Sequence, residues 1–145
     1  MVEWAVNLSD TSQQWKLTQV EDTGCVMDTT KTYQFRNANS NLYMEVVNGK
    51  AEDGSNVQQW GADQPAAHNS WTLKEFGGGY YYILSALADG KTYYLNSVGE
   101  ADGSNIEIRT NNKSSSHLFK FVKNPDGTYT ILTRTSKDQA AVEVA

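Results

Sequence analysis

Residues 52–73 read EDGSNVQQWGADQPAAHNSWTL, and this stretch decides the fold because the rest of the chain repeats it. Its DGSN segment, residues 53–56, is typical of a turn, since Gly accepts a positive φ and Asp and Asn bond their own backbone. We expect a strand at 57–60 and a second short strand at 69–73, after a polar loop. The DGSN turn returns 49 residues later at 102–105, and Phe119 follows Trp71 by 48 residues. The sequence therefore contains a repeat of nearly 50 residues.

A third copy is present in two pieces, one at each end of the chain. Trp4 and Trp15 precede Trp60 and Trp71 by the same 56 residues, within similar sequences. The repeat boundaries follow from this alignment, within a single domain of residues 1–145. They are approximately 31–77, 78–123, and 124–145 joined to 1–20.

Each repeat contains four short strands separated by turns. Tyr33, Tyr81 and Tyr129 are spaced by 48 residues, and each begins a strand that leads through a polar turn into another. No segment has a sustained helical period, so the pattern predicts an all-β fold. We expect twelve strands: two in 1–20, four in 32–75, four in 79–122 and two in 128–144. Three copies of four strands predict a barrel with threefold pseudosymmetry. Its expected core comprises four sets of equivalent residues: Trp15, Trp71 and Phe119; Leu17, Leu73 and Phe121; Phe35, Ile83 and Ile131; and Met44, Leu95 and Val142.

The chain ends fall inside the third repeat. By comparison with the other repeats, about 7–9 residues of a connecting loop are missing between Ala145 and Met1. A closed barrel tolerates a cut in a surface loop because no ladder hydrogen bond is lost. We therefore expect Val2 and Val144 to be neighbours in space.

Composition excludes several classes of function. The formal net charge of −5 disfavours binding to nucleic acid or to an anionic membrane. No apolar run is long enough to span a membrane, and any export signal is expected outside these residues. Cys25, His68 and His117 do not have the spacing of metal ligands, so we expect no metal and no cofactor.

The repeated motifs resemble a known family. An aromatic strand, an L-x-x-[DE]-V segment, a DG turn and two Q-x-W motifs are similar to those of ricin-type β-trefoil lectins, and among these to family 13 carbohydrate-binding modules. The resemblance covers almost the whole chain. It implies a β-trefoil that binds sugars without catalysis, although trefoils support many functions. Family 13 modules are attached to bacterial polysaccharide-degrading enzymes.

The resemblance implies a sugar site in the first repeat. An acidic residue, a polar residue, an aromatic and two amide positions correspond to Glu45, Gln58, Trp60, His68 and Asn69. An indole covers the apolar face of a pyranose, while carboxylates and amides bond its hydroxyls. Glu45 and Trp60 are expected on the surface. The sequence has Glu where Asp is commoner, and His and Asn where Asn and Gln are commoner.

The other two repeats depart further from the pattern. The third offers Glu143, Trp4, Ser12 and Gln13, with Val2 in place of the polar residue, and we expect a weaker site there. In the second, the positions hold Asn96, Glu107, Arg109 and Ser116. Because Arg109 removes the stacking aromatic, we expect that this repeat no longer binds sugar.

Structural roles remain alternatives for several of these residues. Gln13 and Asn69 can simply bond the backbone of their own repeats, and His68 can be an ordinary loop residue. For the whole domain we expect a secreted, monomeric module that targets an attached glycoside hydrolase to galactan, arabinogalactan or xylan through galactosyl or xylosyl units. The alternatives are a protein-interaction trefoil, such as a protease inhibitor or cytoskeletal binder, and a glycoside hydrolase that uses Glu45 and Glu143.

Overall fold

A computed structural model describes residues 1–19 and 27–145, which contain twelve strands and no helix longer than one turn. Cys25 lies outside the described residues. The strands fall in the four predicted segments. They are β1 (Val2–Ala5), β2 (Gln14–Gln19), β3 (Thr32–Asn37), β4 (Tyr43–Val46), β5 (Ser55–Trp60), β6 (Trp71–Gly77), β7 (Tyr80–Ser85), β8 (Tyr93–Ser97), β9 (Ser104–Thr110), β10 (Phe119–Lys123), β11 (Tyr129–Thr133) and β12 (Ala140–Glu143).

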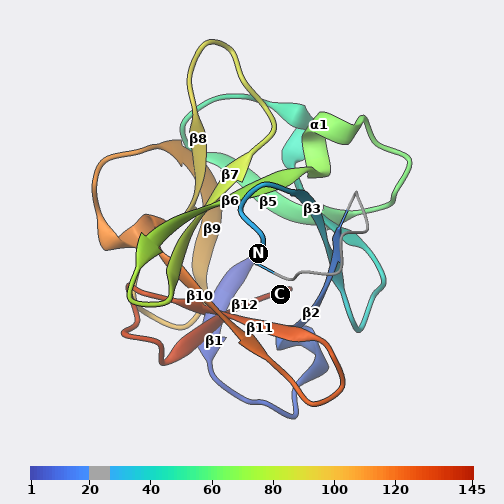
Figure 1. Cartoon of the computed structure of the whole chain (residues 1–145), viewed down its shortest axis with the longest axis vertical. Coiled ribbons are helices and arrows are strands. Elements are labelled where there is room, and N and C mark those ends of the chain that lie inside the picture. The colour runs from blue at the N-terminus through green and yellow to red at the C-terminus, as the bar shows by residue number, and fades with distance from the viewer. Residues whose placement is uncertain (20–26) are drawn as a thin grey trace.

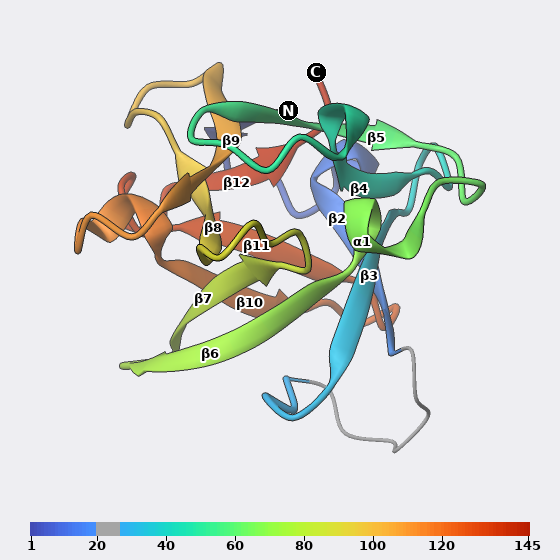
Figure 2. The same ribbon diagram turned by 90° about the horizontal axis from the view of Figure 1, so that it is seen from above.

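Six strands close a barrel. Antiparallel pairing runs from β2 to β3, β6, β7, β10, β11 and back to β2. The other six strands form three pairs, β4–β5, β8–β9 and β12–β1, which lie together over one end of the barrel (Figure 2). This is a β-trefoil, as the repeats predicted.

The first and last strands complete the third pair. Val2 lies opposite Glu143 in the β1–β12 register, which confirms that the two ends of the chain are neighbours. Both termini lie near the centre of the molecule in Figure 1. The Met1 ammonium donates to the carbonyl of Val57 at 3.2 Å, and burial lowers the pKa of this amine. The N-terminus is therefore part of the cap.

Equivalent residues of the three repeats fill the core. Trp15, Trp71 and Phe119 are fully buried, and so are most of the other predicted core residues. Leu17 and Phe121 are partly buried and pack against this cluster. A single hydrophobic cluster thus supports all three repeats, and polar residues of the cap are held above it.

The predicted DGSN turns have the backbone that their sequence requires. Gly54 and Gly103 have φ values of 87° and 85°, in the left-handed region. Gly54 N–H donates to the Ile108 carbonyl, and Gly103 N–H donates to the Glu3 carbonyl. Each turn therefore holds the hairpin of its own repeat against the hairpin of the next.

Four single helical turns complete the fold. Three are 3₁₀ turns, η1 (Thr11–Gln13), η2 (Val47–Gly49) and η3 (Ser115–His117), and the fourth is α1 (Ala66–Asn69). The prediction of a strand from residue 69 is wrong at its start, because Pro65 precedes one helical turn and β6 begins only at Trp71. The side chains of His68 and Asn69 consequently approach the cap from a helix.

Candidate functional site

In the first repeat, Glu45 and Gln58 face each other across two paired strands. β4 and β5 pair these residues directly, and Gln58 Nε2 donates to Glu45 Oε1 at 2.9 Å. The prediction that Glu45 lies on the surface is wrong: its side chain is only 2% exposed, because helix α1 packs against β4. Glu45 Oε2 is buried and has no protein partner.

Helix α1 brings two further predicted site residues to the same strand. Asn69 is buried; its Oδ1 accepts a hydrogen bond from Gln34 Nε2 at 3.0 Å, while its Nδ2 has no partner. His68 packs directly on Gly49 of η2, where a Cβ would lie 2.1 Å from His68 Nε2. Gly49 also has a φ of +60°. Glycine at this position therefore allows the close approach of the imidazole.

Trp60 is the exposed member of the first-repeat group. It ends β5, and half of its side chain, 51%, is accessible to solvent. Trp4 ends β1 in the equivalent position of the third repeat and is 50% exposed. Both indoles present a flat apolar surface beside a polar group, as stacking against a sugar ring requires.

The third-repeat amide is fully occupied by protein groups. Gln13 Nε2 donates to the Ala5 carbonyl at 2.6 Å and to Glu143 Oε2 at 3.1 Å, while Gln13 Oε1 accepts from Asn7 N–H. Ser12 donates to the Asp10 carboxylate in the η1 turn. The structural alternative for Gln13 thus describes its contacts.

Comparison of the two repeats reveals an open pair of polar groups. Asn69 is equivalent to Gln13, and Glu45 is equivalent to Glu143, but Asn is shorter than Gln by one methylene. No hydrogen bond joins Asn69 to Glu45; instead Nδ2 of one and Oε2 of the other are buried without partners. Buried polar atoms normally have partners. The first repeat therefore lacks one bridging group that the third repeat supplies from its own side chain.

The second repeat replaces the aromatic platform with an ion pair. Arg109 Nε donates to Glu107 Oε1 at 2.8 Å, and this bond raises the pKa of Arg109. Asn96 Nδ2 donates to the same Glu107 oxygen at 3.2 Å. The predicted loss of a stacking surface in this repeat agrees with these contacts.

The second repeat also solves a core problem differently. The indoles of Trp15 and Trp71 donate to the carbonyls of Val142 and Met44 at 2.8 and 3.1 Å. Phe119 has no such donor. The equivalent Leu95 carbonyl is met by the His117 ring, with Nδ1 at 3.4 Å.

His117 is buried as a neutral ring. Its Nε2 accepts from Asn112 N–H, which leaves Nδ1 as the ring donor to Leu95. Burial lowers the pKa of His117 below its ordinary value of 6.5. This histidine therefore has a structural role, as a substitute for the indole donor.

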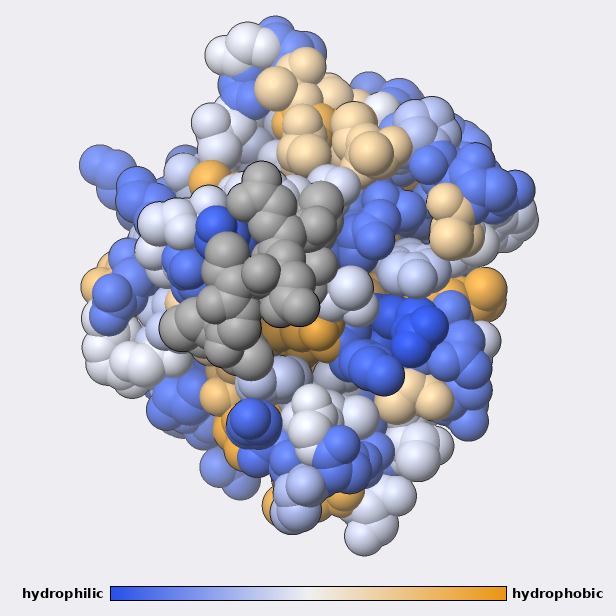
Figure 3. Space-filling view, turned by 45° about the vertical axis from the view of Figure 1, so that its right-hand side comes forward, coloured by the Kyte–Doolittle hydropathy of each residue, from blue (hydrophilic) through white to orange (hydrophobic). Residues whose placement is uncertain are grey.

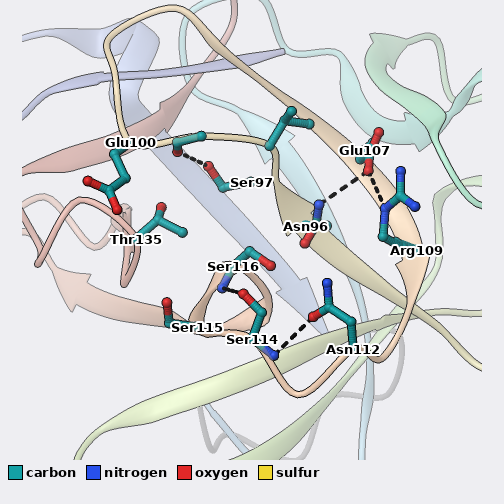
Figure 4. Close-up of a pocket in the computed structure, with 12 residues that line it drawn as sticks. Asn96, Ser97, Glu100, Glu107, Arg109, Asn112, Ser114, Ser115, Ser116 and Thr135 are labelled. Atoms are coloured by element: carbon teal, nitrogen blue, oxygen red, sulfur yellow. Dashed lines mark hydrogen bonds and ion pairs between the residues drawn. The ribbon is translucent and has the colours of Figure 1, made fainter.

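A cavity of about 470 Å³ lies in the second repeat, where the sequence predicted no binding. Its walls come from the end of β8 with its following loop, from β9, from the segment 112–116 and from Thr135 (Figure 4). Sequence reasoning missed Ser97, Glu100, Asn112 and Thr135 because they belong to three separate segments and to no motif. The only signal was the concentration of Ser and Asn at 111–116.

Two searches of the described residues define what else the chain offers. Among residues 1–19 and 27–145, no three His, Cys, Asp or Glu side chains are grouped so that they could hold a metal ion. Within the same residues, no helix is long and apolar enough to cross a membrane.

The sequence model of the ricin-type β-trefoil lectin domain-like family matches residues 11–96, more than half of the chain. The chain belongs to this family. The lectin domain is also similar in fold to a designed protein with threefold symmetry, ThreeFoil, with a TM-score of 0.68 and 20% identity over 79% of this chain and 89% of the design. A comparison with curated proteins gives no match.

A second solved structure with this fold is an exo-β-1,3-galactanase from Clostridium thermocellum. The TM-score is 0.64 with 20% identity, and the match covers 91% of this lectin domain. It covers only 27% of the galactanase chain. At this identity the likeness establishes a shared fold, which the trefoil pairing of the strands already indicates.

Proposed function

We propose that this domain is a non-catalytic carbohydrate-binding module whose first repeat contains its main sugar site. The observation that carries the proposal is the open pair formed by Glu45 Oε2 and Asn69 Nδ2, both buried and without partners. A sugar hydroxyl can donate to a carboxylate and accept from an amide at the same time. One hydroxyl between these two groups would supply the bond that Gln13 makes in the third repeat.

The exposed indole of Trp60 would complete this site. Gln58 holds one oxygen of Glu45 and thereby leaves the other for the ligand. Hydrogen bonds to a charged group contribute about 1.5–3 kcal/mol, and aromatic stacking adds about 0.5–1.5 kcal/mol beyond the buried area. Such a site binds one sugar unit weakly, so its natural ligand would be a polymer that engages more than one site.

We propose galactosyl or xylosyl units of a polysaccharide as the ligand and an attached glycoside hydrolase, outside the cell, as the enzyme that is targeted. The family match supports sugar binding, and the galactanase with a similar fold acts on a galactose polymer according to its name. The third repeat would add a weaker site through Trp4 and Glu143, where Gln13 already occupies the carboxylate.

The contacts argue against a hydrolase that uses Glu45 and Glu143. Glycosidases require two carboxyl groups about 5–10 Å apart, one of them free to donate a proton. Here each glutamate lies in a separate hairpin and accepts a hydrogen bond from an amide of its own repeat. A protein-docking role has little support on the face shown in Figure 3, where hydrophilic residues predominate and apolar areas are small.

Affinity electrophoresis in gels that contain xylan, galactan or soluble cellulose tests the proposal. Trp60→Ala should reduce retardation by at least about tenfold in affinity, since stacking and burial are lost together. Phe76→Ala is the matched control, because Phe76 is an equally exposed aromatic (58%) outside the group. Equal retardation of the parent and Trp60→Ala in every gel would disprove the assignment of the first repeat.

A further inference from the structure

The second-repeat cavity has the size of a binding site for a small molecule. Its volume of about 470 Å³ falls within the ~300–1,000 Å³ typical of such sites. It extends beyond the acid, amide and aromatic positions of the repeat, because Ser97, Glu100 and Thr135 contribute to its far side (Figure 4).

The buried polar atoms around this cavity require hydrogen-bond donors. Asn96 lines the cavity and is only 5% exposed. Its Nδ2 donates to Glu107, an acceptor, which leaves Oδ1 as the atom that is buried without a partner. A ligand that satisfies Oδ1 must therefore supply an O–H or N–H group.

A buried carboxylate strengthens this requirement. Glu3 lies directly behind the wall, where its Oε2 accepts hydrogen bonds from the hydroxyls of Ser97 at 2.8 Å and Thr135 at 3.4 Å. These two hydroxyls line the cavity. Since their protons point to Glu3, they present lone pairs rather than donors to the cavity.

The charge of the lining selects against anions. Glu100 and Glu107 line the cavity together with one cation, Arg109, and Arg109 is already paired with Glu107. Glu3 adds a further carboxylate behind the wall. The lining includes no aromatic side chain, so a ligand would be held by its polar edge.

We propose that this cavity is a second ligand site, which binds a single hydroxyl-rich sugar unit of neutral or positive charge by hydrogen bonds and without aromatic stacking. It excludes acidic sugars. The proposal rests on the sugar-binding function of the domain, but it uses a different repeat and different chemistry from the Trp60 site. The ligand classes are thus neutral sugars and amino sugars, with uronic acids rejected.

Galactose, galactosamine and galacturonate are matched probes, because they differ in one substituent each. In ¹⁵N-labelled protein, the Asn96 side-chain amide reports on the cavity and the Trp60 indole N–H reports on the first repeat. Galactose and galactosamine should shift the Asn96 signals, whereas galacturonate should bind there about fivefold more weakly or less. An equal or larger Asn96 shift with galacturonate would overturn the proposal.

Ser115→Trp separates the two sites. Ser115 is exposed and lines the cavity, so an indole there would fill it. The Asn96 response should disappear in Ser115→Trp, while the Trp60 response should remain. Thr29→Trp, at an exposed position elsewhere, should leave both unchanged. Thermal melting of each variant verifies folding.

The outcomes distinguish this proposal from the proposed function. A Trp60 response without any Asn96 response would refute the second site and retain the first. An Asn96 response that persists in Ser115→Trp would also refute it. An Asn96 response that Ser115→Trp abolishes, with no Trp60 response, would support the cavity and refute the first-repeat assignment.

Discussion

Asn69→Gln should exchange sugar binding for stability. Gln13 shows how the longer amide behaves in the third repeat, where it reaches Glu143 at 3.1 Å. In the first repeat, Gln at position 69 would reach Glu45 and close the open pair. The variant should therefore fold more stably and lose the first sugar site.

The expected magnitude follows from the groups involved. A hydrogen bond to a charged group contributes about 1.5–3 kcal/mol, and ordering the longer side chain offsets part of this, so a net gain of about 1–2 kcal/mol is expected. For a domain of this size, that raises Tm by about 2–8 °C. Losing the bridging hydroxyl of the ligand should weaken sugar binding about tenfold or more.

Calorimetry can measure both quantities on the same variant. Differential scanning gives Tm, and titration with galacto- and xylo-oligosaccharides gives the affinity. Gln13→Asn is the reverse control: it should open the third repeat, lower Tm, and leave the first-repeat affinity unchanged. If Asn69→Gln lowers Tm, or binds sugar as tightly as the parent, the open pair is not the site.

Three further changes test individual contacts. Gly49→Ala should destabilise the domain by about 1–2 kcal/mol through its left-handed backbone and displace His68, which urea unfolding and a sugar titration would detect. Because the pKa of His117 is lowered by burial, its contribution to stability is complete above about pH 6.5 and is lost as the pH falls below that value. His117→Asn should remove this part of the pH dependence of urea unfolding, and an unchanged profile would contradict the neutral buried ring. Trp71→Phe should leave the Met44 carbonyl unpaired and cost about 1–3 kcal/mol from that group alone, measured as a fall in Tm.

Spacing predicted the fold because it reports on the backbone. The 48-residue interval between Tyr33, Tyr81 and Tyr129 and the offset between Trp15 and Trp71 fixed which strands are equivalent. Alternating burial then follows from the strand itself, as in β3, where every second residue faces the core. The exposure of Trp60 could be predicted for the same reason.

The details of the site depend on packing that no spacing encodes. Glu45 is buried because a single helical turn packs against its strand, and that turn appears where a strand was expected. The different reach of Gln13 and Asn69 becomes meaningful only when the equivalent carboxylates are placed beside them. The second-repeat cavity is formed by segments far apart in sequence, and Thr135 enters it from a loop of the third repeat.

The pairing of the first strand with the last determines how the domain responds to mechanical force. β1 and β12 are antiparallel, and Val2 and Glu143 lie at the open end of that pair. A pull on both chain ends would load these hydrogen bonds one after another, so the pair would unzip at low force. Tension between one chain end and a sugar held at Trp60 would instead act through the β4–β5 hairpin and its contacts with β9. A domain anchored at a single end is therefore better suited to hold a polymer under flow than one stretched between both ends.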